Sequence, residues 1–248
     1  MRPWVFIPQS RPKASLRLFC FAHAGGSASQ YYTWAKALPQ EFEMVGVQLP
    51  GRGSRIQEAS ETQFDGLLDA MERGLSDEWD RPFAFFGHSL GGILAFELAR
   101  KLNAKGNPPL HVIVSAVRAA SLFHDSARRN FSQMTDPELR ADMKLLGGTP
   151  AAMLENEELV ELILPILRAD YALIESYRYY PTDPMDVPLT VMAGLSDPET
   201  TRASVQVWKS ETRQPFAEKW YPGDHFFIQS QESAVIRDVV AALLRPPV

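Results

Sequence analysis

Residues 87–91, Gly-His-Ser-Leu-Gly, constrain the fold of this chain more than any other segment. A short apolar run at residues 82–86 precedes them and suits one buried strand, and residues 93–102 after them have the composition of a helix. A Gly-x-Ser-x-Gly pattern between a strand and a helix predicts a nucleophile elbow, a strained turn that exposes a reactive serine. The flanking glycines keep side chains out of the crowded bend. The pattern therefore indicates a serine hydrolase with Ser89 as its nucleophile.

Apolar runs alternate with helical stretches along the chain, which predicts an α/β fold with a mostly parallel sheet covered by helices. The runs expected to form strands are residues 16–21, 44–49, 82–86, 110–116, 189–193 and 218–221. The runs expected to form helices are residues 28–38, 63–79, 93–102 and 232–244. Together with the elbow, this order predicts the α/β-hydrolase fold in a single domain over residues 1–248.

Residues 121–187 interrupt this alternation. They are helical in character, with turn signals at residues 147–150 and a proline, Pro165, inside an apolar run. An insertion between two sheet strands lies over the carboxyl ends of the strands, where ligands bind in open α/β sheets. We therefore expect a helical lid, and the alternative is an ordinary pair of packing helices.

Charge and composition exclude several classes of protein. The net charge of −5 argues against nucleic acid as the main partner. The apolar run near the amino terminus is too short for a signal peptide, and no segment has the length of a membrane span. The single cysteine, Cys20, lies in an apolar run and is expected to be a buried thiol. We expect a cytoplasmic monomer that contacts neither nucleic acid nor membrane.

A serine nucleophile needs a base, and in the elbow fold the acid and the histidine follow the serine in the chain. Three histidines follow Ser89: His111, His124 and His225. His111 opens an expected strand, and His124 begins the lid segment. His225 follows the last expected strand, where a loop returns to the carboxyl edge of the sheet. We therefore predict His225 as the general base.

The acid that orients this histidine is predicted to be Asp197, in the loop after the strand at residues 189–193. This loop lies next to the loop that carries His225, because the two strands are neighbours. The alternatives are Asp224, whose side chain should point away from the adjacent histidine, and Asp183, which together with Asp186 is typical of a turn.

An oxyanion hole requires two backbone N–H groups aimed at the developing negative charge. One is expected from Leu90, directly after the nucleophile, and the other from the loop after the strand at residues 16–21. In that loop Ala24 is the preferred donor. His23 is expected to order the loop, and His88 to be a packed structural residue.

Six segments of the chain together resemble the type II thioesterases, the stand-alone partners of polyketide and non-ribosomal peptide synthases. These segments are FAHAGG at residues 21–26, LPGR at 49–52, FFGHSLGG at 85–92, LGGTP at 146–150, RADY at 168–171 and GDHFF at 223–227. The two lid segments, at 146–150 and 168–171, are the more specific ones, because lids diverge freely between hydrolase families.

The resemblance implies hydrolysis of short acyl thioesters on the phosphopantetheine arm of acyl or peptidyl carrier proteins, as an editing step. It also implies that Ser89 attacks, His225 moves the proton, Asp197 orients it, and the amides of Leu90 and Ala24 hold the oxyanion. Such a triad needs no metal, nucleotide or flavin, so no cofactor is expected.

The same residues are compatible with three other functions. The alternatives are a chain-releasing medium-chain thioesterase, a carboxylesterase that acts on oxygen esters, and a non-catalytic module that binds carrier proteins. Carrier proteins are typically acidic, so Arg128, Arg129 and Arg168 in the lid are candidate docking groups. For these arginines the alternative is a solvated charge or an internal salt bridge.

Overall fold

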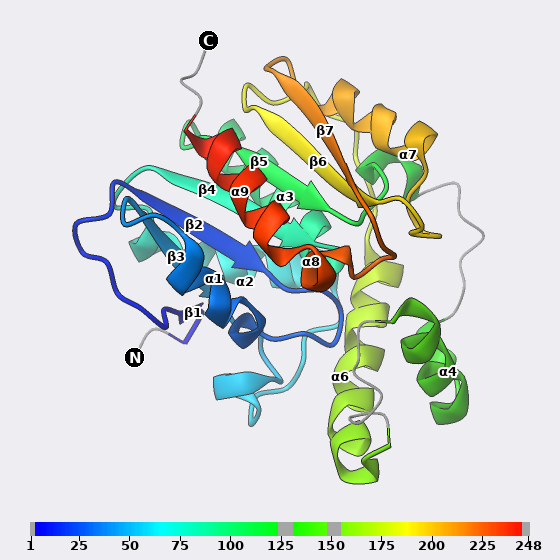
Figure 1. Cartoon of the computed structure of the whole chain (residues 1–248). Coiled ribbons are helices and arrows are strands. Elements are labelled where there is room, and N and C mark those ends of the chain that lie inside the picture. The colour runs from blue at the N-terminus through cyan, green and yellow to red at the C-terminus, as the bar shows by residue number, and fades with distance from the viewer. Residues whose placement is uncertain (1–2, 124–130, 148–154, 245–248) are drawn as a thin grey trace.

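A computed structural model of the chain describes residues 3–123, 131–147 and 155–244. Its centre is a seven-stranded sheet with the strand order β1-β3-β2-β4-β5-β6-β7, which runs through the molecule in Figure 1. The strands are β1 (Val5–Phe6), β2 (Leu16–Phe21), β3 (Phe42–Val47), β4 (Phe83–His88), β5 (Val112–Ser115), β6 (Leu189–Gly194) and β7 (Phe216–Tyr221). Strand β1 pairs antiparallel with β3, and all other neighbouring pairs are parallel. The predicted α/β class is confirmed.

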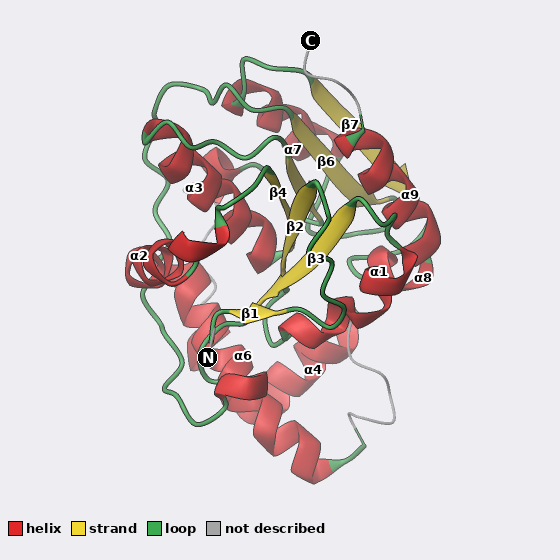
Figure 2. Ribbon diagram, turned by 90° about the vertical axis from the view of Figure 1, so that its left-hand side faces the viewer, coloured by secondary structure: helices red, strands yellow, loops and turns green. Residues whose placement is uncertain are grey.

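Helices cover both faces of the sheet. Figure 2 shows α2 and α3 on one side and α1, α8 and α9 on the other. The α-helices are α1 (Tyr32–Ala37), α2 (Phe64–Gly74), α3 (Leu90–Ala104), α4 (Asp136–Leu146), α6 (Glu157–Ser176), α7 (Arg202–Gln206), α8 (Phe227–Ser230) and α9 (Glu232–Leu243). Alternate residues along the strands pack into two apolar cores, one on each face of the sheet. Phe19 and Phe85 belong to one core, and Cys20 and Phe86 belong to the other. Continuous apolarity of the strands is thus explained by burial on both faces.

Helices α4 and α6 lie side by side at the carboxyl edge of the sheet, within the segment expected to form a lid (Figure 1). They share a small apolar core of their own, formed by Leu139, Met143, Val160, Leu164, Leu167 and Tyr171. Helix α6 continues through Pro165 without a break in its helical assignment. Both Pro165 and Glu161, whose carbonyl loses its helical N–H donor, are exposed, so water can satisfy that carbonyl.

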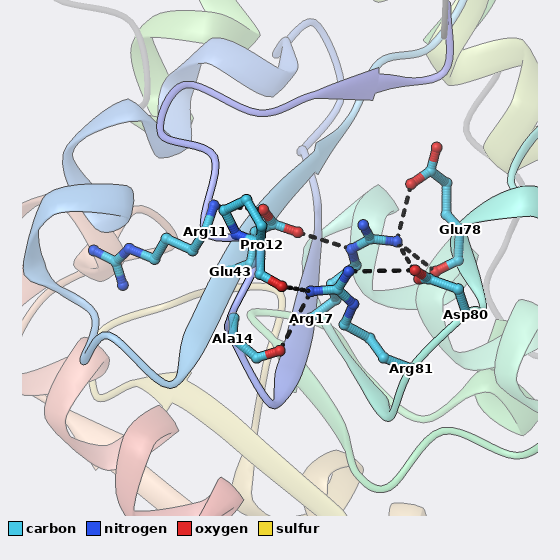
Figure 3. Close-up of polar contacts among 8 residues, drawn as sticks. All are labelled: Arg11, Pro12, Ala14, Arg17, Glu43, Glu78, Asp80 and Arg81. Carbon is cyan, nitrogen blue, oxygen red and sulfur yellow. Dashed lines mark hydrogen bonds and ion pairs between the residues drawn. The ribbon is translucent and has the colours of Figure 1, made fainter.

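A buried polar cluster holds the opposite, amino edge of the sheet together (Figure 3). The Arg17 guanidinium at the start of β2 donates to the carboxylates of Glu43 at 2.8 Å, Glu78 at 3.1 Å and Asp80 at 2.6 Å. The side chains of Arg17 and Glu43 are only 7% and 3% exposed. This cluster ties β2, β3 and the segment before β4 together, far along the strands from the elbow.

Several boundaries differ from the sequence-based expectations. Strand β3 ends two residues earlier than expected, and the helix expected over residues 28–38 is a 3-10 turn followed by the short α1. The two-residue β1 and the five-residue α7 were not predicted, because elements so short carry no periodic signal. None of the described helices combines the length and apolar character that a bilayer crossing requires.

Candidate active site

Ser89 occupies the turn between β4 and α3, where the elbow was expected. Its backbone has φ 55° and ψ −119°, a conformation that side chains disfavour. The surrounding backbone is too close for larger residues: a Cβ on Gly87 would lie 2.0 Å from the carbonyl oxygen of Gly91, and a Cβ on Gly91 would lie 2.2 Å from that of Phe21. The turn therefore requires both glycines for steric reasons.

His225 lies beside Ser89, as the sequence predicted. It follows β7 and is buried, with its Nε2 3.0 Å from the hydroxyl oxygen of Ser89 and its Nδ1 3.0 Å from Oδ2 of Asp197. Because a carboxylate only accepts hydrogen bonds, Nδ1 is the protonated nitrogen and Nε2 accepts from the serine hydroxyl. This is the arrangement in which a histidine can remove the serine proton.

Asp197 is buried in the loop after β6 and is fixed by further hydrogen bonds. Its Oδ1 accepts from the backbone N–H of Glu199 at 2.9 Å, and its Oδ2 accepts from the hydroxyl of Thr200 at 3.0 Å as well as from His225. The loop geometry thus holds the carboxylate towards the imidazole. The structure brings together Ser89, His225 and Asp197, the three residues chosen from the sequence.

The alternative acids are placed elsewhere. Asp224 is exposed, and its Oδ1 accepts from the backbone N–H of Phe226 at 2.9 Å within its own turn. Asp183 and Asp186 form ion pairs with Arg213 on the surface.

The alternative histidines do not reach Ser89 either, as far as the structure describes them. The Nε2 of His111 lies 2.8 Å from the hydroxyl of Thr190 on a neighbouring strand. His124 lies outside the described residues, as do Arg128 and Arg129 and part of the lid segment at residues 146–150.

Of the two predicted oxyanion donors, Leu90 lies within the elbow and Ala24 lies in the loop after β2. Leu90 is the first residue of α3, so its N–H has no acceptor within the helix. The loop that contains Ala24 follows the end of β2, and the backbone at this end of β2 lies in close contact with Gly91. Neither N–H has an acceptor among the residues that the structure describes, so both are available to a ligand.

Two further histidines, His23 and His88, lie next to the site but do not belong to the hydrogen-bonded series Asp197–His225–Ser89. Burial lowers the pKa of His23 to about 4, and its Nδ1 donates to the carbonyl of Ala24 at 2.9 Å. Burial also lowers the pKa of His88 well below its usual range, and its Nδ1 lies 2.9 Å from the hydroxyl of Ser115. Both rings are therefore neutral near pH 7, as packed structural residues should be.

A cavity of about 310 Å³ opens over Ser89 and His225. Apolar and aromatic side chains from α3, from the loop after β5 and from the lid make most of its wall, including Ile93, Val117, Phe123, Phe131 and Ile174. The wall also includes polar residues that the sequence did not single out: Arg118, Asp142 and Glu199. A cavity of about 530 Å³ between α2, α3 and residues 177–185 contains none of the three triad residues.

Arg168, a candidate docking group, is engaged inside the lid. Its guanidinium donates to the carbonyls of Ser132 at 2.6 Å and Met134 at 2.5 Å, and to the carboxylate of Asp136 at 2.8 Å. The internal salt bridge, which was the alternative for this residue, is the arrangement found. Within the described ranges, no cluster of three or more histidine, cysteine or acidic residues could hold a metal ion.

The chain is similar to known proteins over nearly its whole length. Residues 16–243 match the family model described as "Thioesterase domain". The gramicidin S biosynthesis protein GrsT of Aneurinibacillus migulanus is 34% identical over 94% of this chain and 91% of its own length. The thioesterase PikA5 of Streptomyces venezuelae is 35% identical over 97% of this chain and 85% of its own length.

Solved structures are similar over nearly the whole chain. The type II thioesterase BorB from the borrelidin biosynthetic cluster superimposes with a TM-score of 0.87 and 34% identity, and covers 98% of both chains. The RedJ thioesterase from the prodiginine pathway of Streptomyces coelicolor has a TM-score of 0.86 and 34% identity, over 94% of this chain and 87% of its own.

Proposed function

The chain belongs to the thioesterase family, in its type II branch, and from this premise we propose that it hydrolyses acyl thioesters carried on the phosphopantetheine arm of a carrier protein. The observation that carries the proposal is the hydrogen-bonded series Asp197–His225–Ser89 at the base of an apolar cavity. The biological role would be editing, in which blocking acyl groups are removed from a polyketide or non-ribosomal peptide synthase.

In the first half of the reaction, the Ser89 oxygen attacks the thioester carbonyl while Nε2 of His225 takes its proton. Asp197 accepts from Nδ1 and stabilises the imidazolium that forms. The carbonyl oxygen becomes an oxyanion, which the N–H groups of Leu90 and Ala24 would bind. Collapse of this intermediate breaks the carbon–sulfur bond, and His225 returns the proton to the leaving thiolate.

In the second half, water replaces the thiol. His225 removes a proton from the water as it attacks the acyl-serine ester, the same two N–H groups stabilise the second oxyanion, and Ser89 leaves with the proton. Residues of this chain thus accept and return each proton and stabilise both oxyanions. We therefore propose that the enzyme has no cofactor of its own. The phosphopantetheine belongs to the substrate.

The cavity volume supports small acyl groups as substrates. At about 310 Å³ it lies at the lower end of the range for ligand pockets, roughly 300 to 1,000 Å³. We propose that α4 and α6 act as the lid over this cavity, and that the protein works as a cytoplasmic monomer on the acyl or peptidyl carrier domains of its synthase.

The test is hydrolysis of a series of acyl-pantetheine thioesters of increasing chain length, each with its matched oxygen ester. We expect faster turnover of the thioesters, with the highest kcat/KM for short chains. Ser89→Ala should lower kcat roughly 10⁴-fold or more, because the attacking group is lost. Unchanged turnover by Ser89→Ala would contradict the nucleophile assignment, and a preference for oxygen esters would contradict the substrate class.

A further inference from the structure

The loop that carries the proposed oxyanion donor Ala24 contacts a buried ion pair between Asp170 of the lid helix α6 and Arg52 in the loop after β3. We propose that Asp170 of α6 and its partner Arg52 are positioning residues that fix residues 23–26, so that the N–H of Ala24 stays aimed at the oxyanion. This inference rests on the proposed function, because it assigns to the lid helix a part in the chemistry of that site.

The ion pair is fully enclosed. The two terminal nitrogens of Arg52 donate to the two carboxylate oxygens of Asp170, at 2.5 Å to Oδ2 and 2.6 Å to Oδ1, and the two side chains are 4% and 0% exposed. Two parallel bonds of this kind fix orientation as well as distance. The pair joins α6 to the loop after β3 across 118 positions of sequence.

Asp170 also reaches the oxyanion loop directly. Its Oδ2 accepts from the backbone N–H of Gly25 at 2.7 Å. On the other side of the same peptide, the carbonyl of Ala24 accepts from Nδ1 of His23 at 2.9 Å. The peptide plane that follows Ala24 is thus held at both its N–H and its C=O. In the preceding peptide, which contains the N–H of Ala24, the carbonyl of His23 accepts from the N–H of Gly26 at 3.0 Å, so the direction of the Ala24 N–H is held from the same plane.

Apolar contacts from the same helix support this arrangement. Ile163, Leu167 and Asp170 follow one another at helical spacing and therefore share one face of α6. A Cβ on Gly25 would lie 3.5 Å from a methyl of Leu167 and 3.9 Å from one of Ile163, and Ala24 packs against the apolar core of the lid. One helical face therefore both covers the loop and accepts its N–H.

This arrangement affects the transition state more than the bound substrate. The negative charge that Ala24 would bind develops only as the serine attacks, whereas the acyl group is held by the cavity wall. Displacement of the loop should therefore lower kcat with little change in KM. Complete loss of one oxyanion donor costs about 10²- to 10³-fold in kcat, so a shifted donor should cost roughly tenfold to a hundredfold.

The test compares Asp170→Asn and Arg52→Lys with the wild type on a short acyl-pantetheine thioester. An asparagine has a single acceptor oxygen and cannot serve both Gly25 and the two nitrogens of Arg52. A lysine keeps the charge but loses the paired geometry. We expect kcat to fall in both variants, more strongly in Asp170→Asn, with KM within about threefold of the wild type.

A second readout separates positioning from a general structural role. A trifluoromethyl ketone analogue adds to Ser89, whose proton passes to His225, and the ketone oxygen becomes an oxyanion in the same place as in the reaction. We expect its inhibition constant to rise by the same factor as kcat/KM falls, because both report oxyanion binding. A fall in kcat without loss of inhibitor affinity would overturn the proposal, as would a rise in KM alone.

The matched control is Arg17→Gln, which breaks the other buried arginine–carboxylate cluster at the opposite edge of the sheet (Figure 3). It should lower the melting temperature and leave both kcat and the inhibition constant unchanged. If Arg17→Gln lowers kcat as much as Asp170→Asn does, general destabilisation explains both results and the proposal is wrong.

A double variant keeps the test decisive if an unpaired buried charge prevents folding. Arg52→Met with Asp170→Leu replaces the ion pair by apolar side chains, a change that proteins often accept without loss of stability. It should fold but keep the low kcat, since Gly25 has lost its acceptor, and wild-type kcat in this variant would overturn the proposal.

An activated oxygen ester, 4-nitrophenyl acetate, separates a failure of the proposed thioesterase function from a failure of the positioning role of Asp170 and Arg52. A wild-type enzyme that hydrolyses this ester and no acyl thioester would contradict the proposed function. The same variants assayed on the ester would then still decide whether Asp170 and Arg52 position the loop.

Discussion

Replacement of Ser89 by glycine should stabilise the protein relative to its replacement by alanine. Ser89 and Ala116 are the non-glycine residues with positive φ in the described part of the chain, and Ser89 combines φ 55° with ψ −119°. Such a backbone costs about 1–3 kcal/mol for a residue with a Cβ. Ser89→Ala retains this strain, and Ser89→Gly removes it.

The size of the effect follows from two opposing contributions. Relief of strain favours the folded glycine variant by about 1–3 kcal/mol, and the greater freedom of glycine in the unfolded chain opposes it by about 0.4–1 kcal/mol. Both variants lose the hydrogen bond between the serine hydroxyl and His225, so that loss cancels. The net expectation is a free energy of unfolding about 1 kcal/mol higher for Ser89→Gly, or roughly 2–4 °C in melting temperature at this chain length.

Thermal and urea unfolding of Ser89→Gly and Ser89→Ala measures this difference directly. Ala70→Gly, in the middle of α2, is the control for ordinary helical backbone, and it should lower the free energy of unfolding by about 1 kcal/mol. The reasoning is refuted if Ser89→Gly is less stable than Ser89→Ala by a similar amount, because the elbow would then store no strain.

Three further predictions concern neighbouring parts of the site. Asp197→Asn should lower the steady-state kcat by about 10³- to 10⁴-fold, because an amide favours the wrong histidine tautomer. Asp224→Asn should keep the wild-type kcat. Equal losses of kcat in the two variants would contradict the acid assignment. Gly194→Ala should lower the free energy of unfolding in urea by about 2 kcal/mol, since its Cβ would lie 2.2 Å from the backbone oxygen of Asp224; a neutral result would show that the loops can separate. The pKa of His23 is about 4 in the folded protein and about 6.5 in the unfolded chain. Between these two pH values the unfolded chain binds a proton that the folded protein does not. The free energy of unfolding therefore falls as the pH falls through this window, by at most about 1.4 kcal/mol per pH unit. Urea unfolding at pH 7.5 and pH 5 should therefore show a smaller loss for His23→Asn than for the wild type, and equal losses would contradict the lowered pKa.

Much of the arrangement of the candidate site was predictable because its determinants are local. The elbow is specified by five consecutive residues, and His225 and Asp197 each follow directly after a strand. Since neighbouring parallel strands end at the same edge of the sheet, their positions in the chain were enough to bring them near Ser89.

The remaining features depend on contacts between distant segments. Strand β1 has two residues, and its pairing with β3 cannot be read from so short a run. The contact between Asp170 and Arg52 joins segments 118 residues apart. Both belong to segments that the family resemblance marked, LPGR and RADY, but the sequence contains no sign that these two segments meet.

This contact limits how the lid can move. Separation of α6 from the oxyanion loop at Asp170 would leave two buried opposite charges and the N–H of Gly25 without partners, which costs several kcal/mol. At the amino-terminal end of the same helix, the partly exposed ion pair of Arg140 with Glu157 joins α6 to α4, and Val160 and Leu164 pack in the apolar core that the two helices share. Displacement is therefore costly at the end of α6 that contacts the oxyanion loop, whereas α4 and the end of α6 near residue 157 can shift together without losing the contacts that they make with each other. We therefore expect a movement of the proposed lid to change the shape of the cavity over Ser89 while Ala24 stays in position.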